Sequence, residues 1–139
     1  MGMVHTEITL INAADEIRAK DGNCKKEEIR QITVNALVDT GAWTLVINDE
    51  LRERLGLKFM GIESGDLANG VTELYNRAGP LEIWWKNRQI FGEALVIPGA
   101  KEVLLGAIPL EGLDLIVDPL KQEVIGAHGD ERVYQIYRI

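Results

Sequence analysis

Residues 36–42 constrain the fold of this chain most, because an apolar run leads directly into a carboxylate. The apolar residues 36–38 precede Asp39, and Thr40-Gly41-Ala42 follow it. An apolar run of this kind predicts a buried strand, and Asp-Thr-Gly predicts a tight loop at its end. The strand would deliver Asp39 to a partly buried position, where an unpaired charge is costly. Asp39 is therefore a candidate site residue, although Asp, Thr and Gly also form ordinary strand-ending turns.

Alternating apolar residues predict strands along most of the chain. We expect strands or hairpins at 7–12, 29–38, 43–47, 67–74, 81–97, 103–106, 113–117 and 123–125. A short helix is expected at 49–55, between a capping Asn48 and Gly56, and one helical turn at 108–111. Residues 13–20 fit either a helical turn or an irregular excursion. The pattern is that of an all-β protein with one or two short helices.

A second motif, Val103-Leu104-Leu105-Gly106, is an apolar run that ends in glycine. Together with Val38-Asp39-Thr40-Gly41-Ala42, it resembles the retroviral-type (retropepsin-like) aspartic proteases over about residues 33–124. In that family an Asp-Thr-Gly loop carries the catalytic aspartate, and a later apolar-apolar-Gly strand passes beneath it. The resemblance implies a retropepsin-like acid-protease barrel, a single lobe that dimerises. We expect one domain over residues 1–139, with a core at about 29–125 and a C-terminal extension at about 126–139.

Aspartic protease chemistry needs two facing carboxylates that share a proton. The sequence contains one Asp-Thr-Gly and no second copy. The second carboxylate must then come from another copy of the chain, with Asp39 and its symmetry mate at a two-fold axis. The resemblance thus predicts a homodimeric aspartic endopeptidase that hydrolyses a peptide or protein substrate.

The resemblance also assigns roles around Asp39. Thr40 would brace the paired loops, Gly41 would let the backbones approach closely, and Ala42 matches a small residue of the motif. Leu105 and Gly106 would pack beneath the loop. A hairpin with a type I′ turn at Asn69-Gly70 would be the flap over the substrate, with an ordinary surface hairpin as the alternative. The predicted flap residues are Ala68, Asn69, Gly70 and Val71.

Three predictions concern residues outside these motifs. Trp43 is expected to fill the core. Trp84 and Trp85 must point to opposite faces of a strand. The tail Val133–Ile139 alternates β-forming residues and predicts a terminal strand, which we expect to form part of the dimer interface.

Composition excludes several other functions. A net charge of -7 leaves no basic surface for nucleic acid. His5 and His128 are far apart and predict no metal site, and no phosphate-loop or dinucleotide motif implies a cofactor. The lone Cys24, with no signal-peptide or membrane-spanning pattern, favours a cytoplasmic protein that does not enter membranes. The alternative function is a non-catalytic peptide-binding module of the same fold.

Overall fold

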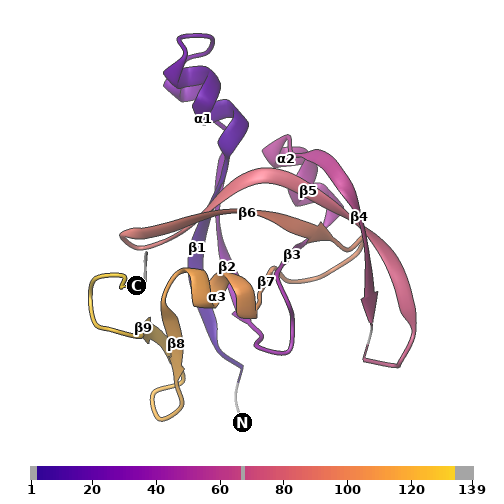
Figure 1. The fold of residues 1–139 in the computed structure, drawn as a ribbon, viewed down its shortest axis with the longest axis vertical. Helices are drawn as coiled ribbons and strands as arrows, with labels where there is room; N and C mark the ends of the chain where they lie inside the picture. The colour runs from indigo at the N-terminus through magenta and orange to yellow at the C-terminus, as the bar shows by residue number, and fades with distance from the viewer. Residues whose placement is uncertain (1–2, 67, 134–139) are drawn as a thin grey trace, which may run out of the picture.

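A closed barrel of β-strands forms the centre of the computed structural model, which describes residues 3–66 and 68–133 (Figure 1). The strand order is β1-β2-β7-β3-β6-β5-β4, and β1 also pairs with β5. This extra pairing closes six strands into a ring and leaves β4 on the outside. The strands are β1 His5–Asn12, β2 Gln31–Val38, β3 Leu45–Ile47, β4 Lys58–Asp66, β5 Thr72–Trp85, β6 Arg88–Val96 and β7 Leu104–Leu105. The expected all-β barrel is confirmed.

Within residues 3–66 and 68–133, three short α-helices and one 3-10 helix connect the strands. They are α1 Ala13–Lys20, η1 Lys26–Glu28, α2 Asp49–Leu55 and α3 Ala107–Gly112. The predicted helix at 49–55 is confirmed, because Asn48 Oδ1 accepts a hydrogen bond from Leu51 N at 2.8 Å and Gly56 ends the helix at φ 64°. For residues 13–20, the structure selects the helix over the irregular excursion.

Period-two alternation fills the barrel with apolar side chains. Ile8 and Leu10 of β1 are buried, while Glu7, which alternates with them, is exposed. Leu10 lies opposite Ile32 on one side and Ile83 on the other, so β1 contributes to both halves of the core. Among the described residues, the other fully buried large aliphatic side chains are Leu45, Ile47, Leu55, Leu57, Leu81, Ile83, Leu105 and Leu113.

The two adjacent tryptophans of β5 point to opposite faces, as predicted. Trp85 is 6% exposed, and its indole N–H donates to Thr6 Oγ1 at 2.8 Å. Trp84 is half-buried, and its indole N–H donates to Glu82 Oε1 at 3.1 Å. Each indole N–H therefore has a partner.

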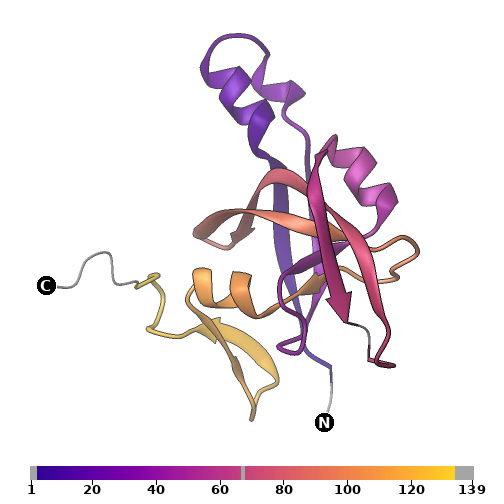
Figure 2. The same cartoon turned by 45° about the vertical axis from the view of Figure 1, so that its right-hand side comes forward.

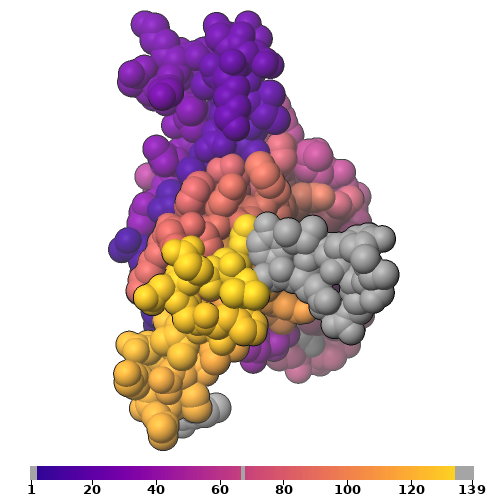
Figure 3. Space-filling view, turned by 60° about the vertical axis from the view of Figure 1, so that its left-hand side comes forward, coloured from indigo at the N-terminus to yellow at the C-terminus, as the bar shows by residue number. Residues whose placement is uncertain are grey.

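Helix α1 and the segment after it project from the barrel (Figures 2 and 3). Asp15 anchors this projection and is fully buried. Its carboxylate accepts hydrogen bonds from Arg30 Nε at 2.8 Å, Arg30 Nη2 at 2.9 Å and Arg30 N at 3.0 Å, and it pairs with Arg18. The Arg30 side chain holds the pKa of Asp15 below its usual value.

The C-terminal part forms a separate two-stranded sheet of β8 Leu115–Asp118 and β9 Glu123–Gly126. Asp114 ties the following segment to it, because Oδ2 accepts from Val133 N at 3.0 Å and Oδ1 contacts His128 Nδ1 at 2.9 Å. These contacts, the Val133 N–H first, lower the pKa of Asp114. Of the predicted terminal strand, Val133 lies in no strand, and residues 134–139 are outside the described residues.

Candidate active site

The loop between β2 and β3 holds the Asp39 side chain at the end of β2, a partly exposed strand in which Ala36 is buried. Asp39 N donates to Leu105 O at 3.1 Å, and Ala42 N donates to Asp39 O at 3.0 Å. Gly41 N donates to the Asp39 carboxylate itself, at 2.9 Å from Oδ1. The loop backbone therefore orients the carboxylate, while Thr40 and Gly41 remain exposed.

Residues Leu105 and Gly106 lie directly against this loop. A Cβ atom at Gly106 would be 2.4 Å from Thr44 O and 2.7 Å from Ala42 O, which no side chain allows. The first turn of α3 continues the contact, because Ala107 N donates to Ala42 O at 2.9 Å and Ile108 N donates to Trp43 O at 3.0 Å. The glycine thus allows α3 to begin against the loop that carries Asp39.

Asp39 opens onto one end of the molecule. It borders a cavity of about 430 Å³ together with Val4, Leu37, Val117 and Pro119. The 39–44 loop, the tip of the β4–β5 hairpin, the β8–β9 turn and the N-terminal end all lie at this end, opposite α1 (Figures 1 and 2). The end that carries Asp39 is therefore built from four separate parts of the chain.

The predicted flap hairpin is present, but its turn differs from the prediction. The strands close at the pair Asp66–Thr72, and residues 68–71 are the described residues of the tip between them. Gly70 has φ 83°, whereas Asn69 has no positive φ and uses its side-chain oxygen to accept from Val71 N at 3.0 Å. A type I′ turn needs positive φ at both central residues, so the type I′ prediction is wrong. The Asn-Gly pair instead forms part of a longer loop.

Sequence comparison decides the family. The family model described as aspartyl protease matches residues 26–107, which is more than half of the chain. The chain belongs to the aspartyl protease family. Its fold is similar to that of the crystal structure of the retroviral protease-like domain of Ddi1 from Leishmania major. That likeness has a TM-score of 0.53 at 19% identity and covers 86% of this chain and 84% of that chain.

The predicted retropepsin-like fold is thereby confirmed, since a likeness at this identity shows a shared fold. No curated protein matches the sequence. Among residues 3–66 and 68–133, no group of three or more His, Cys, Asp or Glu side chains is placed to hold a metal ion. None of the helices in the described part of the chain has the length and apolar composition that a membrane crossing requires.

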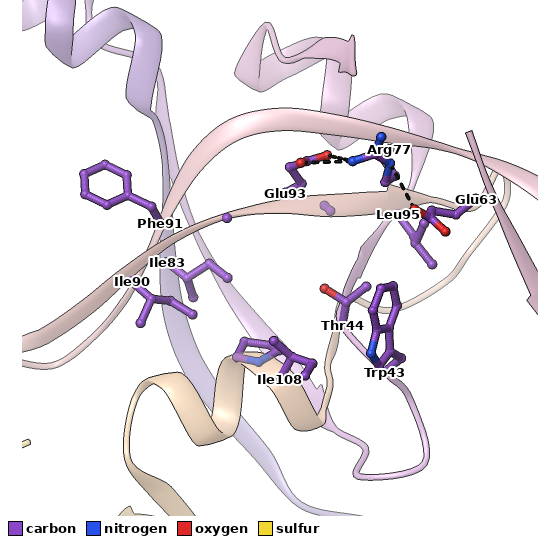
Figure 4. Close-up of a pocket in the computed structure, with 13 residues that line it drawn as sticks. Trp43, Thr44, Glu63, Arg77, Ile83, Ile90, Phe91, Glu93, Leu95 and Ile108 are labelled. Carbon is purple, nitrogen blue, oxygen red and sulfur yellow. Dashed lines mark hydrogen bonds and ion pairs between the residues drawn. The ribbon is translucent and has the colours of Figure 1, made fainter. Parts of the chain in front are cut away.

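In this member of the aspartyl protease family, Trp43 is a surface residue. Its side chain is 61% exposed, so the prediction that it fills the core is wrong. The strand β3 begins only at Leu45, and the Trp43 backbone is bound to α3 through its carbonyl, which leaves the side chain outside the barrel. Trp43 instead borders a pocket of about 230 Å³ between the loop, α3, β6 and the inner face of the hairpin (Figure 4).

The hairpin contributes charged residues to this pocket. Arg77 of β5 lies between Glu63 and Glu93, with Nη1 2.8 Å from Glu93 Oε2 and Nε 3.4 Å from Glu63 Oε1 (Figure 4). Tyr75 shares the same face, because it lies opposite Glu63 in the strand register. Burial and the neighbouring Glu73 raise the pKa of Tyr75.

The structure therefore brings together Asp39, Thr40, Gly41, Ala42, Leu105 and Gly106, and it places Ala68–Val71 on a separate element at the same end. Sequence reasoning missed the Trp43 pocket and the charged group around Arg77. The signal available was the alternation of Glu73, Tyr75 and Arg77, but the facing residue Glu63 requires the correct hairpin register.

Proposed function

We propose that the chain is an aspartic endopeptidase that acts as a homodimer, with one Asp39 from each copy. One observation carries the proposal: the Gly41 N–H fixes Asp39 Oδ1 at 2.9 Å, while Oδ2 has no hydrogen-bond partner among the described residues. A carboxylate that is oriented through one oxygen and open at the other is suited to bind and activate a water molecule.

The mechanism needs two such carboxylates with one shared proton. The ionised Asp39 takes a proton from the water as it attacks the peptide carbonyl, and the protonated Asp39 of the second copy donates to the carbonyl oxygen. The tetrahedral intermediate collapses when the Asp39 that took the water proton passes it to the leaving nitrogen, while the Asp39 of the other copy takes back a proton from a hydroxyl of the intermediate. No metal or cofactor takes part in these steps.

Support for the dimer comes from the motif count and from the open end of the molecule. The sequence supplies one Asp-Thr-Gly for a reaction that uses two aspartates. Thr40 and Gly41 are exposed at the end where the hairpin tip and the β8–β9 turn also lie. In the proposed dimer, Thr40 braces the paired loops, Gly41 and Ala42 allow them to approach, and Ala68, Asn69, Gly70 and Val71 cover the substrate.

A non-catalytic peptide-binding module of the same fold is the second candidate. The exposed Trp43 beside the Asp39 loop favours it, because a surface aromatic in a pocket can bind a peptide without any chemistry. Both functions would use the surface around the Asp39 loop to bind a peptide, and they differ in whether Asp39 activates water.

Digestion of a broad peptide mixture from acidic to neutral pH separates the two functions. Activity of a singly protonated pair should give a bell-shaped pH–rate profile on the acidic side of neutrality. Asp39→Asn should lower the cleavage rate by about 100-fold or more, because general acid–base catalysis is lost, while sedimentation still shows the dimer. Wild-type protein that cleaves nothing, or an Asn variant that cleaves equally well, would exclude the endopeptidase and leave the binding module.

A further inference from the structure

The pocket beside Trp43 has one apolar wall made of exposed side chains. Trp43 is 61% exposed and Ile108 is 52% exposed, and both line the pocket, whereas the Phe91 ring points away from it (Figure 4). Large apolar side chains on a surface mark binding sites more often when they gather in a concave place. Trp43 makes no cation–π contact within the described residues, and at 61% exposure its indole is accessible to a ligand.

The opposite wall carries a net negative charge. Glu63, Arg77 and Glu93 are the ionisable residues among those that line the pocket, so two carboxylates face one guanidinium. Arg77 Nη1 donates to both oxygens of Glu93, at 3.1 and 2.8 Å. Glu63 meets Arg77 only at 3.4 Å and makes no other hydrogen bond or ion pair in the described part of the chain. Its side chain is 39% exposed, so its oxygens remain accessible to a ligand.

An apolar wall opposite a carboxylate with one long ion pair, Glu63, matches a side chain with an apolar stem and a cationic tip. We propose that this pocket binds an arginine or lysine side chain of the peptide substrate, with the stem against Trp43 and Ile108 and the cation at Glu63. Such side chains bury their methylene groups while the charge stays near water or a carboxylate, and the cation is attracted to an indole face. An anionic side chain is disfavoured, because Arg77 already serves two carboxylates.

The pocket lies within reach of a peptide held at Asp39. Trp43 follows Ala42 in the same loop, and Ile108 N binds the Trp43 carbonyl at 3.0 Å. Asp39 is not among the residues that line the pocket, so we expect the bound side chain at a position other than the two that flank the cleaved bond. The inference deepens the proposed function and rests on a peptide-binding groove at this end of the molecule.

A matched peptide series tests the inference. One cleaved peptide is varied at each position from two to five residues on either side of the bond, with lysine, arginine, norleucine or glutamate. At one position lysine and arginine should exceed norleucine by about tenfold in kcat/KM, as expected for one charge-assisted contact. Glu63→Gln should abolish this preference, and Trp43→Ala should weaken cleavage of both the lysine and the norleucine peptides. Glu50→Gln, an exposed position on α2, is the matched control and should change neither.

The outcomes separate failure of the inference from failure of the proposed function. Cleavage without a basic preference, a preference for norleucine or glutamate, or a basic preference that survives Glu63→Gln overturns the inference and leaves the endopeptidase. If no peptide is cleaved, the same series is titrated against the protein by tryptophan fluorescence, with Trp43→Phe to identify the signal. Tighter binding of lysine than of norleucine then supports the inference, and equal or absent binding overturns it.

Discussion

Two aspartates of this chain have environments that suit opposite tasks. Asp15 is fully buried and accepts three hydrogen bonds from Arg30, so all of its charge is used to hold α1. The Asp39 carboxylate accepts one hydrogen bond among the described residues, from the Gly41 N–H of its own loop. Nothing next to Asp15 in the sequence indicates the first role, since Arg30 is 15 residues away, whereas the second follows from the residues adjacent to Asp39.

Asp15→Asn should lower the free energy of unfolding by about 2 kcal/mol at neutral pH. This loss in the free energy of unfolding is smaller than for a fully buried ion pair, because the side chains of Arg18 and Arg30 are half-exposed and can reach water. The pKa of Asp15 is lower in the folded state, so its stabilisation is present above the ordinary value and disappears as pH falls through the folded-state value. Denaturant unfolding from pH 7 down to strong acid should show the difference from wild type shrinking. Asp21→Asn is the exposed control, and a difference that stays constant with pH would contradict the assignment.

The sequence pattern predicts many of the strands and helices of this fold, but it does not predict the loops and turns that join them. Alternation predicted most of the strands, including β1 and β2, and Asn48 with Gly56 predicted α2, because those signals act within a few residues. It did not predict β4 Lys58–Asp66 or residues 75–80 of β5. The prediction of a type I′ turn at Asn69-Gly70 was wrong. The strand pairing ends at Asp66–Thr72, so the loop is longer than two residues and overrides the preference of the Asn-Gly dipeptide. The prediction that Trp43 fills the core was also wrong. The packing of α3 against the loop determines where β3 begins, and sequence spacing does not reveal that packing.

Gly70→Val tests the hairpin as a flap. Gly70 has φ 83°, and the space that a Cβ atom would occupy there is open, so the substitution introduces backbone strain without a clash, at a cost of about 1 kcal/mol. If the tip closes over substrate, kcat/KM should fall more than the melting temperature suggests. Gly22→Val is the matched control, with φ 76°, equally open space and a place on the α1 projection. Equal losses of activity in both variants would identify an ordinary surface hairpin.

The whole molecule presents Asp39 at an end assembled from distant parts of the chain. Family and fold could be predicted from two short motifs, because the Asp39 loop and Gly106 contact each other in the way that the motifs imply. The pocket beside Trp43 could not be predicted from the sequence. Its walls come from the loop, β4, β5, β6 and α3, and its shape depends on how these elements pack.

Dilution tests whether two copies share one active site. If each chain contributes one Asp39, specific activity should fall as the concentration passes below the dimer dissociation constant, with sedimentation showing monomers in the same range. Deletion of residues 134–139 should weaken the dimer, since Val133–Ile139 is predicted to form part of its interface. Full activity per chain in the monomer range would contradict the shared site, and an unchanged dimer after the deletion would contradict the role of the tail.

The pairing of β1 with β5 sets an order of events during synthesis. Leu10 lies opposite Ile83, so β1 cannot form the second of its two strand pairings until β5, far along the chain, has been synthesised. During that interval β1 and β2 can form only an open hairpin whose inner face, with Ile8 and Leu10, stays in contact with water. Such long-range closure slows folding, and the nascent chain is therefore most exposed to aggregation before β5 leaves the ribosome.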